Sequence, residues 1–239
     1  ITAFTWPSTE DGGESSTEAK PPRAIAPHEQ LHGEREVTSN MQPRLNDGSS
    51  TTGFHPVVRI ETSDSYGCTA TAISDDTLVT AVHCLKSGDT VRDWIKVRVA
   101  HGDNSGAEGK YSSHFIFSED LYDNYYVKDS NNGSSYYARD IAFVKFGEGT
   151  FDAYYSLGST VSNGDLNGDA VTLVGFGEND TKHYGAETVT YVAAISNTDY
   201  RYAETDNGNG TTNVEKGDSG GPMLRASGNS YEVVGVLYG

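Results

Sequence analysis

The sequence is poor in cysteine and in positive charge, and it contains no long hydrophobic run. Two cysteines in 239 residues cannot form a zinc ribbon or a disulfide-dense small scaffold. The 17 Lys and Arg residues face 34 Asp and Glu residues, giving a net charge of −17. This charge argues against nucleic acids and anionic membranes as partners, because both require a basic surface. No apolar run approaches the roughly 18 residues of a membrane span. The chain is still long enough to bury a substantial core.

Short β-type runs make up most of the sequence after Pro56, and clusters of Gly, Asn, Asp and Ser separate them. One run, Ile95–Val99, alternates apolar and basic residues as a half-buried strand does. No segment keeps a 3.6-residue apolar period through three helical turns. Many short strands joined by polar turns predict an all-β sandwich or barrel. The other runs are Val57–Glu61, Thr69–Ile73, Thr77–Val82, Ile141–Phe146, Ala170–Val174, Thr188–Ile195 and Tyr231–Tyr238.

A serine flanked by glycines stands out near the end of the chain, in the hexapeptide Gly217–Pro222, which reads GDSGGP. Glycine allows a tight turn that exposes the Ser219 hydroxyl and lets a substrate carbonyl approach the backbone N–H groups. The same letters match the G-x-S-x-G elbow of α/β-hydrolases, in which the histidine follows the serine. The last histidine here is His183, so the α/β-hydrolase interpretation fails, and no alternating strand–helix pattern supports it.

A base for Ser219 must therefore come from upstream. The segment TAVHC places His83 after an apolar run, and the segment RDIAFV places Asp140 at the start of another. The order His83, Asp140, Ser219 is the chain order of the chymotrypsin triad.

These three segments resemble the signatures of the chymotrypsin/trypsin-like serine peptidase family. The segment VGFG at Val174–Gly177 is also similar to the family's Gly-aromatic-Gly stretch, and the resemblance extends from about Leu45 to Gly239. It implies an all-β fold of two six-stranded antiparallel β-barrels. The N-terminal barrel would span 45–158 and carry His83 and Asp140, and the C-terminal barrel would span 159–239 and carry Ser219.

The resemblance also implies a role for each of these residues. Ser219 would be the acylating nucleophile, His83 would accept and return its proton, and Asp140 would hold the histidine tautomer. The backbone N–H groups of Gly217 and Ser219 would form the oxyanion hole. Hydrolysis would then run through an acyl-enzyme without a cofactor.

Further positions follow from the same resemblance. Cys68 and Cys84 match the family's disulfide beside the catalytic histidine, including its spacing. The floor of the primary specificity pocket falls on Asn213, a neutral residue that both donates and accepts hydrogen bonds. The remaining expected substrate-binding residues are Lys216, Tyr238 and Gly239.

The segment Pro43–Gly48 resembles the family's activation site, in which a basic residue precedes an aliphatic one. The resemblance implies that residues 1–44 are a pro-segment, within which residues 8–22 read as a disordered linker. Cleavage after Arg44 would free the ammonium group of Leu45 to pair with Asp218. Such a pair has a physical reason, because a buried carboxylate without a partner is costly.

Two further features complete the sequence-based expectations. The family's last strands and helix have no counterpart after Gly239, so either the sequence is a fragment or the second barrel closes in an unusual way. We expect a second barrel that is incomplete at its C-terminal side, with an exposed strand edge. Asp165, Asn167 and Asp169 are spaced like the first half of a calcium loop, but the Gly and Glu that such a loop needs are absent, so no metal site is expected.

The sequence therefore predicts a monomeric serine endopeptidase, secreted to the exterior or the periplasm, with protein or peptide substrates. Its expected partners include an activating protease, but no nucleic acid, and no membrane span is expected. Two alternatives are a catalytically inactive binding or adhesion module on the same fold and a calcium-dependent acidic matrix protein.

Overall fold

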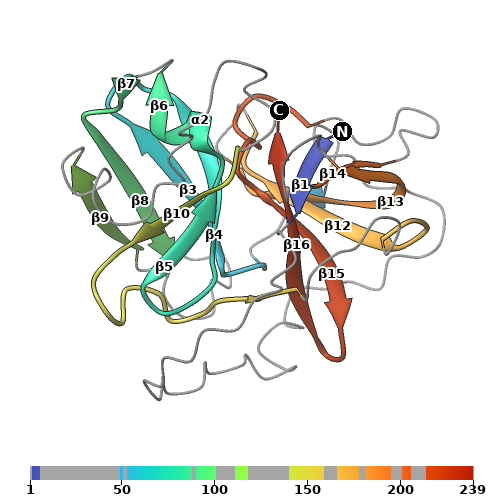
Figure 1. The fold of residues 1–239 in the computed structure, drawn as a ribbon. Helices are drawn as coiled ribbons and strands as arrows, with labels where there is room; N and C mark the ends of the chain where they lie inside the picture. Colours follow the sequence, from blue (N-terminus) through green and yellow to red (C-terminus); the bar gives the residue numbers. More distant parts are fainter. Residues whose placement is uncertain are drawn as a thin grey trace, which may run out of the picture.

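In the computed structural model the chain forms two β-sheets that stand side by side as two lobes (Figure 1). The one helix among the described residues is α2 (Val82–Leu85), a single turn. The expected all-β fold is confirmed. None of the helices in the described part of the chain is long and apolar enough to cross a membrane. The structure describes residues 2–5, 49–50, 53–87, 90–100, 111–117, 140–158, 166–177, 181–194, 201–205 and 214–238.

The first sheet has six antiparallel strands in the order β10-β5-β4-β3-β8-β9. Its strands are buried on one face because their apolar residues alternate with polar ones. In β3, for example, Ile60 is fully buried while Arg59 and Glu61 are half-buried. Strands β6 (Lys86–Ser87) and β7 (Thr90–Val91) form a separate pair after α2. The six strands are β3 (Val57–Thr62), β4 (Gly67–Ala72), β5 (Thr77–Thr80), β8 (Trp94–Ala100), β9 (Tyr111–Phe117) and β10 (Ala142–Lys145).

The second sheet has eight strands and follows the order β1-β14-β13-β12-β15-β16-β11, with β2 paired to β13. A further pairing of β1 with β16 closes the path β1-β14-β13-β12-β15-β16 into a ring. The strands are β1 (Thr2–Thr5), β2 (Ser49–Ser50), β11 (Ser156–Leu157), β12 (Ala170–Gly175), β13 (His183–Ala194), β14 (Arg201–Thr205), β15 (Pro222–Ser227) and β16 (Ser230–Tyr238).

Strand β1 departs from the sequence-based expectation. The sequence predicts residues 1–44 as a pro-segment or linker and an exposed strand edge in the second barrel. In the structure, Thr2–Thr5 lies between β14 and β16 and pairs with both. The physical reason is that the N–H and C=O groups along the edges of two strands need partners, and a short extended segment supplies them. The rest of the predicted pro-segment lies outside the described residues.

The two lobes share one hydrophobic core rather than touching only at their surfaces. Buried residues of β12, β15 and β16, among them Val174, Leu224 and Val236, pack in the same cluster as the core of the first sheet. A second cluster, which includes Leu173, Met223 and Leu237, fills the interior of the second sheet. The common core fixes the position of one sheet against the other.

The disulfide that the resemblance implies is present and joins the middle of the first sheet to α2. Cys68 in β4 and Cys84 in α2 are both buried, with their Cα atoms 6.0 Å apart. The cross-link spans a sequence separation of 16 residues, a loop whose closure is worth about 3 kcal/mol of chain entropy. It therefore anchors the short helix, which a single turn of hydrogen bonds would not hold in place.

Lys182 ties the second sheet to the chain that leads into the first. Its Nζ donates to the carbonyl oxygens of Gly53 and Phe54 at 3.1 and 3.0 Å and lies 5.5 Å from the centre of the Phe176 ring. The Phe54 ring packs against Tyr184 of β13 at a centroid distance of 5.4 Å. Burial lowers the pKa of Lys182 to about 7, because an ammonium group loses its hydration there.

We predict that Lys182 makes the free energy of unfolding depend on pH. The unfolded chain holds the lysine proton up to about pH 10, whereas the folded chain releases it near pH 7, so stability rises with pH across this window. The slope from one proton is at most about 1.4 kcal/mol per pH unit. Urea unfolding of the wild type and Lys182→Met at several pH values measures it, because the variant lacks this contribution.

The matched control is Lys145→Met, which removes a lysine whose side chain is 47% exposed. This variant should follow the wild-type pH dependence. A free-energy difference between wild type and Lys182→Met that stays constant from pH 7 to about 10 would contradict the prediction.

Candidate active site

His83 and Asp140 are brought together by the pairing of β5 with β10. Ala142 lies opposite Thr80, so the residues just before β10 stand beside those just after β5. His83 Nδ1 lies 2.5 Å from Asp140 Oδ2, and the His83 backbone N–H donates to Asp140 Oδ1 at 2.9 Å. The Asp140 carboxylate is buried and accepts both bonds, which places the proton on Nδ1 and leaves Nε2 as the basic nitrogen.

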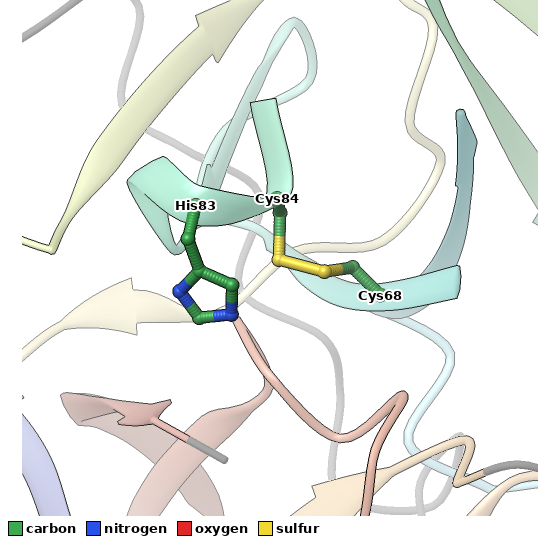
Figure 2. A group of neighbouring side chains, drawn as sticks. All are labelled: Cys68, His83 and Cys84. Carbon is green, nitrogen blue, oxygen red and sulfur yellow. A yellow bond between two sulfur atoms is a disulfide. The ribbon is translucent and has the colours of Figure 1, made fainter. Parts of the chain in front are cut away.

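The turn that carries Ser219 is bound to the first sheet next to α2. The Thr69 backbone N–H donates to the Ser219 carbonyl oxygen at 2.8 Å, and Cys84 Sγ lies 3.5 Å from the same oxygen. Cys84 follows His83 in the chain, and Figure 2 shows the imidazole and the disulfide side by side beneath α2. Ser219 is buried, and His83 Nε2 is a buried nitrogen with no hydrogen-bond partner among the described residues.

The turn that carries Ser219 depends on two glycines. Gly217 has a φ of 104°, and a Cβ there would lie 2.2 Å from the Gly177 carbonyl oxygen. Gly220 has a φ of 83°, and its Cβ would lie 2.2 Å from Thr80 Oγ1. Both contacts are too short for any side chain, and both φ values are left-handed. The turn therefore packs against both sheets at distances that only glycine allows.

Asp218, between these glycines, is buried and points toward the second sheet. Its Oδ1 accepts from the Gly177 N–H at 2.8 Å and its Oδ2 from the Glu215 N–H at 2.9 Å. Burial raises the pKa of the Asp218 carboxyl above its ordinary value, the two backbone N–H groups act against this rise, and the charge of Glu215 adds to it. The carboxylate thus sits in a site where a nearby cation would stabilise its charged form.

Thr69 in β4 is a residue of the site that sequence reasoning did not identify. Its Oγ1 donates to the Gly217 carbonyl oxygen at 2.8 Å and accepts from the Phe176 N–H at 3.2 Å. Together with the bond from its backbone N–H to Ser219, it touches three parts of the second lobe. In the sequence Thr69 is an ordinary strand residue, and its role becomes visible only in its hydrogen bonds to residues that are distant in the chain.

The rim of the site carries an aromatic and basic group of residues. Lys216 is exposed, and its Nζ lies 5.7 Å from the centre of the Tyr66 ring. The guanidinium of Arg92 lies 4.8 Å from the same ring and forms an ion pair with Asp64. The aromatic residue at the end of β16, Tyr238, presents its ring at 5.3 Å from the His83 ring.

Metal-ligand chemistry finds little support among the described residues. Cys68, His83 and Cys84 form a cluster whose ligand atoms lie within 4.8 Å of one another. The two sulfur atoms are joined in the disulfide, so they cannot act as thiolate ligands. Two residues of the calcium-loop pattern are described: Asn167 is exposed, and Asp169 is paired with Arg225 at 3.5 Å.

Four residues expected at the site lie outside the described residues, as does Asp165 of the calcium-loop pattern. The four are Arg44 and Leu45 of the predicted activation site and Asn213 and Gly239 of the predicted substrate-binding set. The structure brings together His83, Asp140 and the Ser219 turn, and it places Lys216 and Tyr238 at the rim.

The comparison with known families gives one match. The family model described as Trypsin matches residues 46–239, a range that contains every described residue of the site. None of the curated proteins matches the chain.

We predict that Thr69→Val destabilises the protein by about 1–3 kcal/mol. The change preserves the size of the side chain but leaves the buried Gly217 carbonyl and Phe176 N–H without their partner. Thr69→Ser is the matched control, since it keeps the hydroxyl group. Denaturant unfolding measures both variants, and equal stability of the two would show that these hydrogen bonds do not hold the turn.

Proposed function

Because the chain belongs to the trypsin family of serine peptidases, we propose that it is a secreted serine endopeptidase that cleaves peptide bonds through an acyl-enzyme. The observation that carries the proposal is the bonded pair of His83 and Asp140 with the Ser219 turn fixed beside it. The two groups come from different sheets, so their meeting is a property of the folded chain rather than of a local motif.

The proposed first step is attack by Ser219 Oγ on the carbonyl carbon of the scissile bond. His83 Nε2 takes the hydroxyl proton and returns it to the leaving amine, and water then hydrolyses the acyl-enzyme by the same route in reverse. Asp140 stays ionised, keeps the ring oriented through Nδ1 and stabilises the imidazolium that forms.

The negative charge of the tetrahedral intermediate would be stabilised by the backbone N–H groups of Gly217 and Ser219. The left-handed φ of Gly217 and the bond from Thr69 to its carbonyl support this role, because they fix the orientation of the neighbouring peptide groups. Donors held in place before reaction cost no reorganisation in the transition state.

The proposed substrates are proteins or peptides whose backbone is bound at the end of β16. Tyr238 and Gly239 would bind the substrate backbone, and Lys216 would lie at the rim beside the leaving group. Asn213 would form the floor of the primary pocket. The contact of the Tyr238 ring with the His83 ring supports a substrate path that leads to the base.

We further propose that cleavage after Arg44 activates the enzyme. The new ammonium group of Leu45 would enter the site of Asp218, where burial raises the carboxyl pKa and disfavours the charged form. An opposite charge removes that penalty. Because Asp218 lies between Gly217 and Ser219, an ion pair there would hold both oxyanion donors in place.

We predict that the activated chain is labelled at Ser219 by a fluorophosphonate. His83→Ala should lower the labelling rate by about three to six orders of magnitude, because the hydroxyl then has no base. His114→Ala in β9 is the matched control and should label like the wild type. A cleaved, folded full-length protein that takes up no label would point instead to the inactive binding module.

A second prediction concerns processing. Mass spectrometry of the active species should find Leu45 as its N-terminus, and Arg44→Gln should remain uncleaved and inactive. Arg23→Gln, which removes a basic residue of the same segment, should be activated normally. Activity should fall at alkaline pH, where the Leu45 ammonium group loses its proton. The ion pair with Asp218 raises the pKa of this group above the ordinary α-amino value of about 8, so the fall should occur above that pH.

Full activity of a chain in which residues 1–44 are still covalently attached would contradict the activation step. It would leave the assignment of the nucleophile and the base unaffected, because the labelling of Ser219 tests those residues separately.

A further inference from the structure

The amino-terminal strand β1 occupies an interior place in the second sheet. Thr2–Thr5 runs antiparallel to β14 on one side and to β16 on the other. Figure 1 shows this strand in blue between β14 and β16, with the two marked ends of the chain close together. A strand bonded along both edges is held by two hydrogen-bond ladders, whereas a strand at the edge of a sheet has only one.

The stretch of β16 that pairs with β1 is also the stretch that supports the site. Leu237 donates its N–H to the Gly221 carbonyl at 2.8 Å, and its own carbonyl accepts from the Gly220 N–H at 2.9 Å. Backbone groups alternate between the two edges of a strand, so β1 binds β16 through the neighbours of Leu237. One of these is Tyr238, which lies opposite Thr2 and whose ring contacts His83.

Strand β1 pairs with positions of β14 and β16 that belong to the second core. Ala3 lies opposite Ala203 of β14 and Leu237 of β16, and both of these residues are fully buried. Loss of the strand would leave two rows of backbone N–H and C=O groups without partners. The two ladders of hydrogen bonds therefore stabilise the bound strand.

Within this sequence no disulfide can join residues 1–44 to the rest of the chain. This segment contains no cysteine, and the two cysteines of the protein are joined to each other. After a cut at Arg44, strand pairing would be the means of retention.

We propose that the amino-terminal segment is retained on activation, with β1 bound in the groove between β14 and β16. The active enzyme is then a non-covalent pair of residues 1–44 and 45–239. The cut at Arg44 rests on the proposed function, but the binding of β1 does not. The segment therefore acts as a structural part of the catalytic body and positions the end of β16 for substrate.

The test uses the full chain with Ser219→Ala, which prevents self-digestion, and with the recognition sequence of a site-specific protease inserted within residues 8–22. The cut chain is passed over a size-exclusion column in native buffer and again in denaturant. We expect the fragment that holds β1 to co-elute with the body in native buffer and to separate in denaturant. Separation in native buffer would overturn the proposal.

Variants of Ala3 test whether strand pairing is the cause of retention. Ala3→Pro removes a backbone N–H from the interior of the strand and should weaken retention by about a hundredfold. Ala3→Ser, which keeps the N–H, and Ala19→Pro, which places the proline outside the strand, should both retain the fragment. Equal retention in Ala3→Pro would overturn the proposal.

Hydrogen exchange of the cut chain gives a readout that does not depend on any variant in β1. The amides of Val236 and Tyr238 should remain protected after the cut if β1 stays in place, and exchange as fast as in an unpaired strand would overturn the proposal. If the Ser219→Ala chain retains the fragment, while the chain that keeps Ser219 shows no processing at Arg44 or no activity after processing, the proposed function is overturned and the binding of β1 stays intact.

Discussion

The candidate site depends on the attachment of the Ser219 turn to β4 of the other sheet. The backbone N–H of Thr69 bonds to Ser219, and its hydroxyl bonds to Gly217, so one residue holds the turn at two points. The same strand carries Cys68, whose disulfide fixes the helix of His83. The proposed nucleophile and the proposed base are thus attached to the same strand, and a change in the distance between the sheets would affect both together. The shared core makes such a change costly, because interiors are closely packed.

Much of this arrangement is predictable from the sequence, because the informative signals are local. His83, Asp140 and Ser219 each stand in a short segment whose neighbours are constrained by the turn or strand they form. The glycines at 217 and 220 are an example. Each has a left-handed φ and packs where a Cβ would clash, so a glycine in the sequence indicates the backbone conformation at that position. The apolar–polar pattern of the β-type runs similarly predicts which residues of a strand are buried and which are exposed.

The features that the sequence did not predict depend on contacts between distant segments. Thr69 is one threonine among many in strand-like runs, and its importance comes from residues more than 100 positions away. In the sequence nothing distinguishes Lys182 from a surface lysine, because the carbonyl groups of residues 53 and 54 that accept its hydrogen bonds lie far away in the chain. The short TAFT segment has no length or period that would mark an interior strand, because its place is set by the edges of β14 and β16.

The Cys68–Cys84 bond lies next to the residue that we propose as the base, and this position has a consequence for when the protein can work. Disulfides form in oxidising surroundings and are kept reduced in the cytosol. While the two thiols are reduced, the single turn of α2 lacks its covalent tether to β4, and the His83 ring loses part of its support. For the proposed peptidase, the redox state of the compartment would therefore act as a second control beside the proposed cleavage. A chain that has not reached an oxidising environment would lack the support that its proposed base needs.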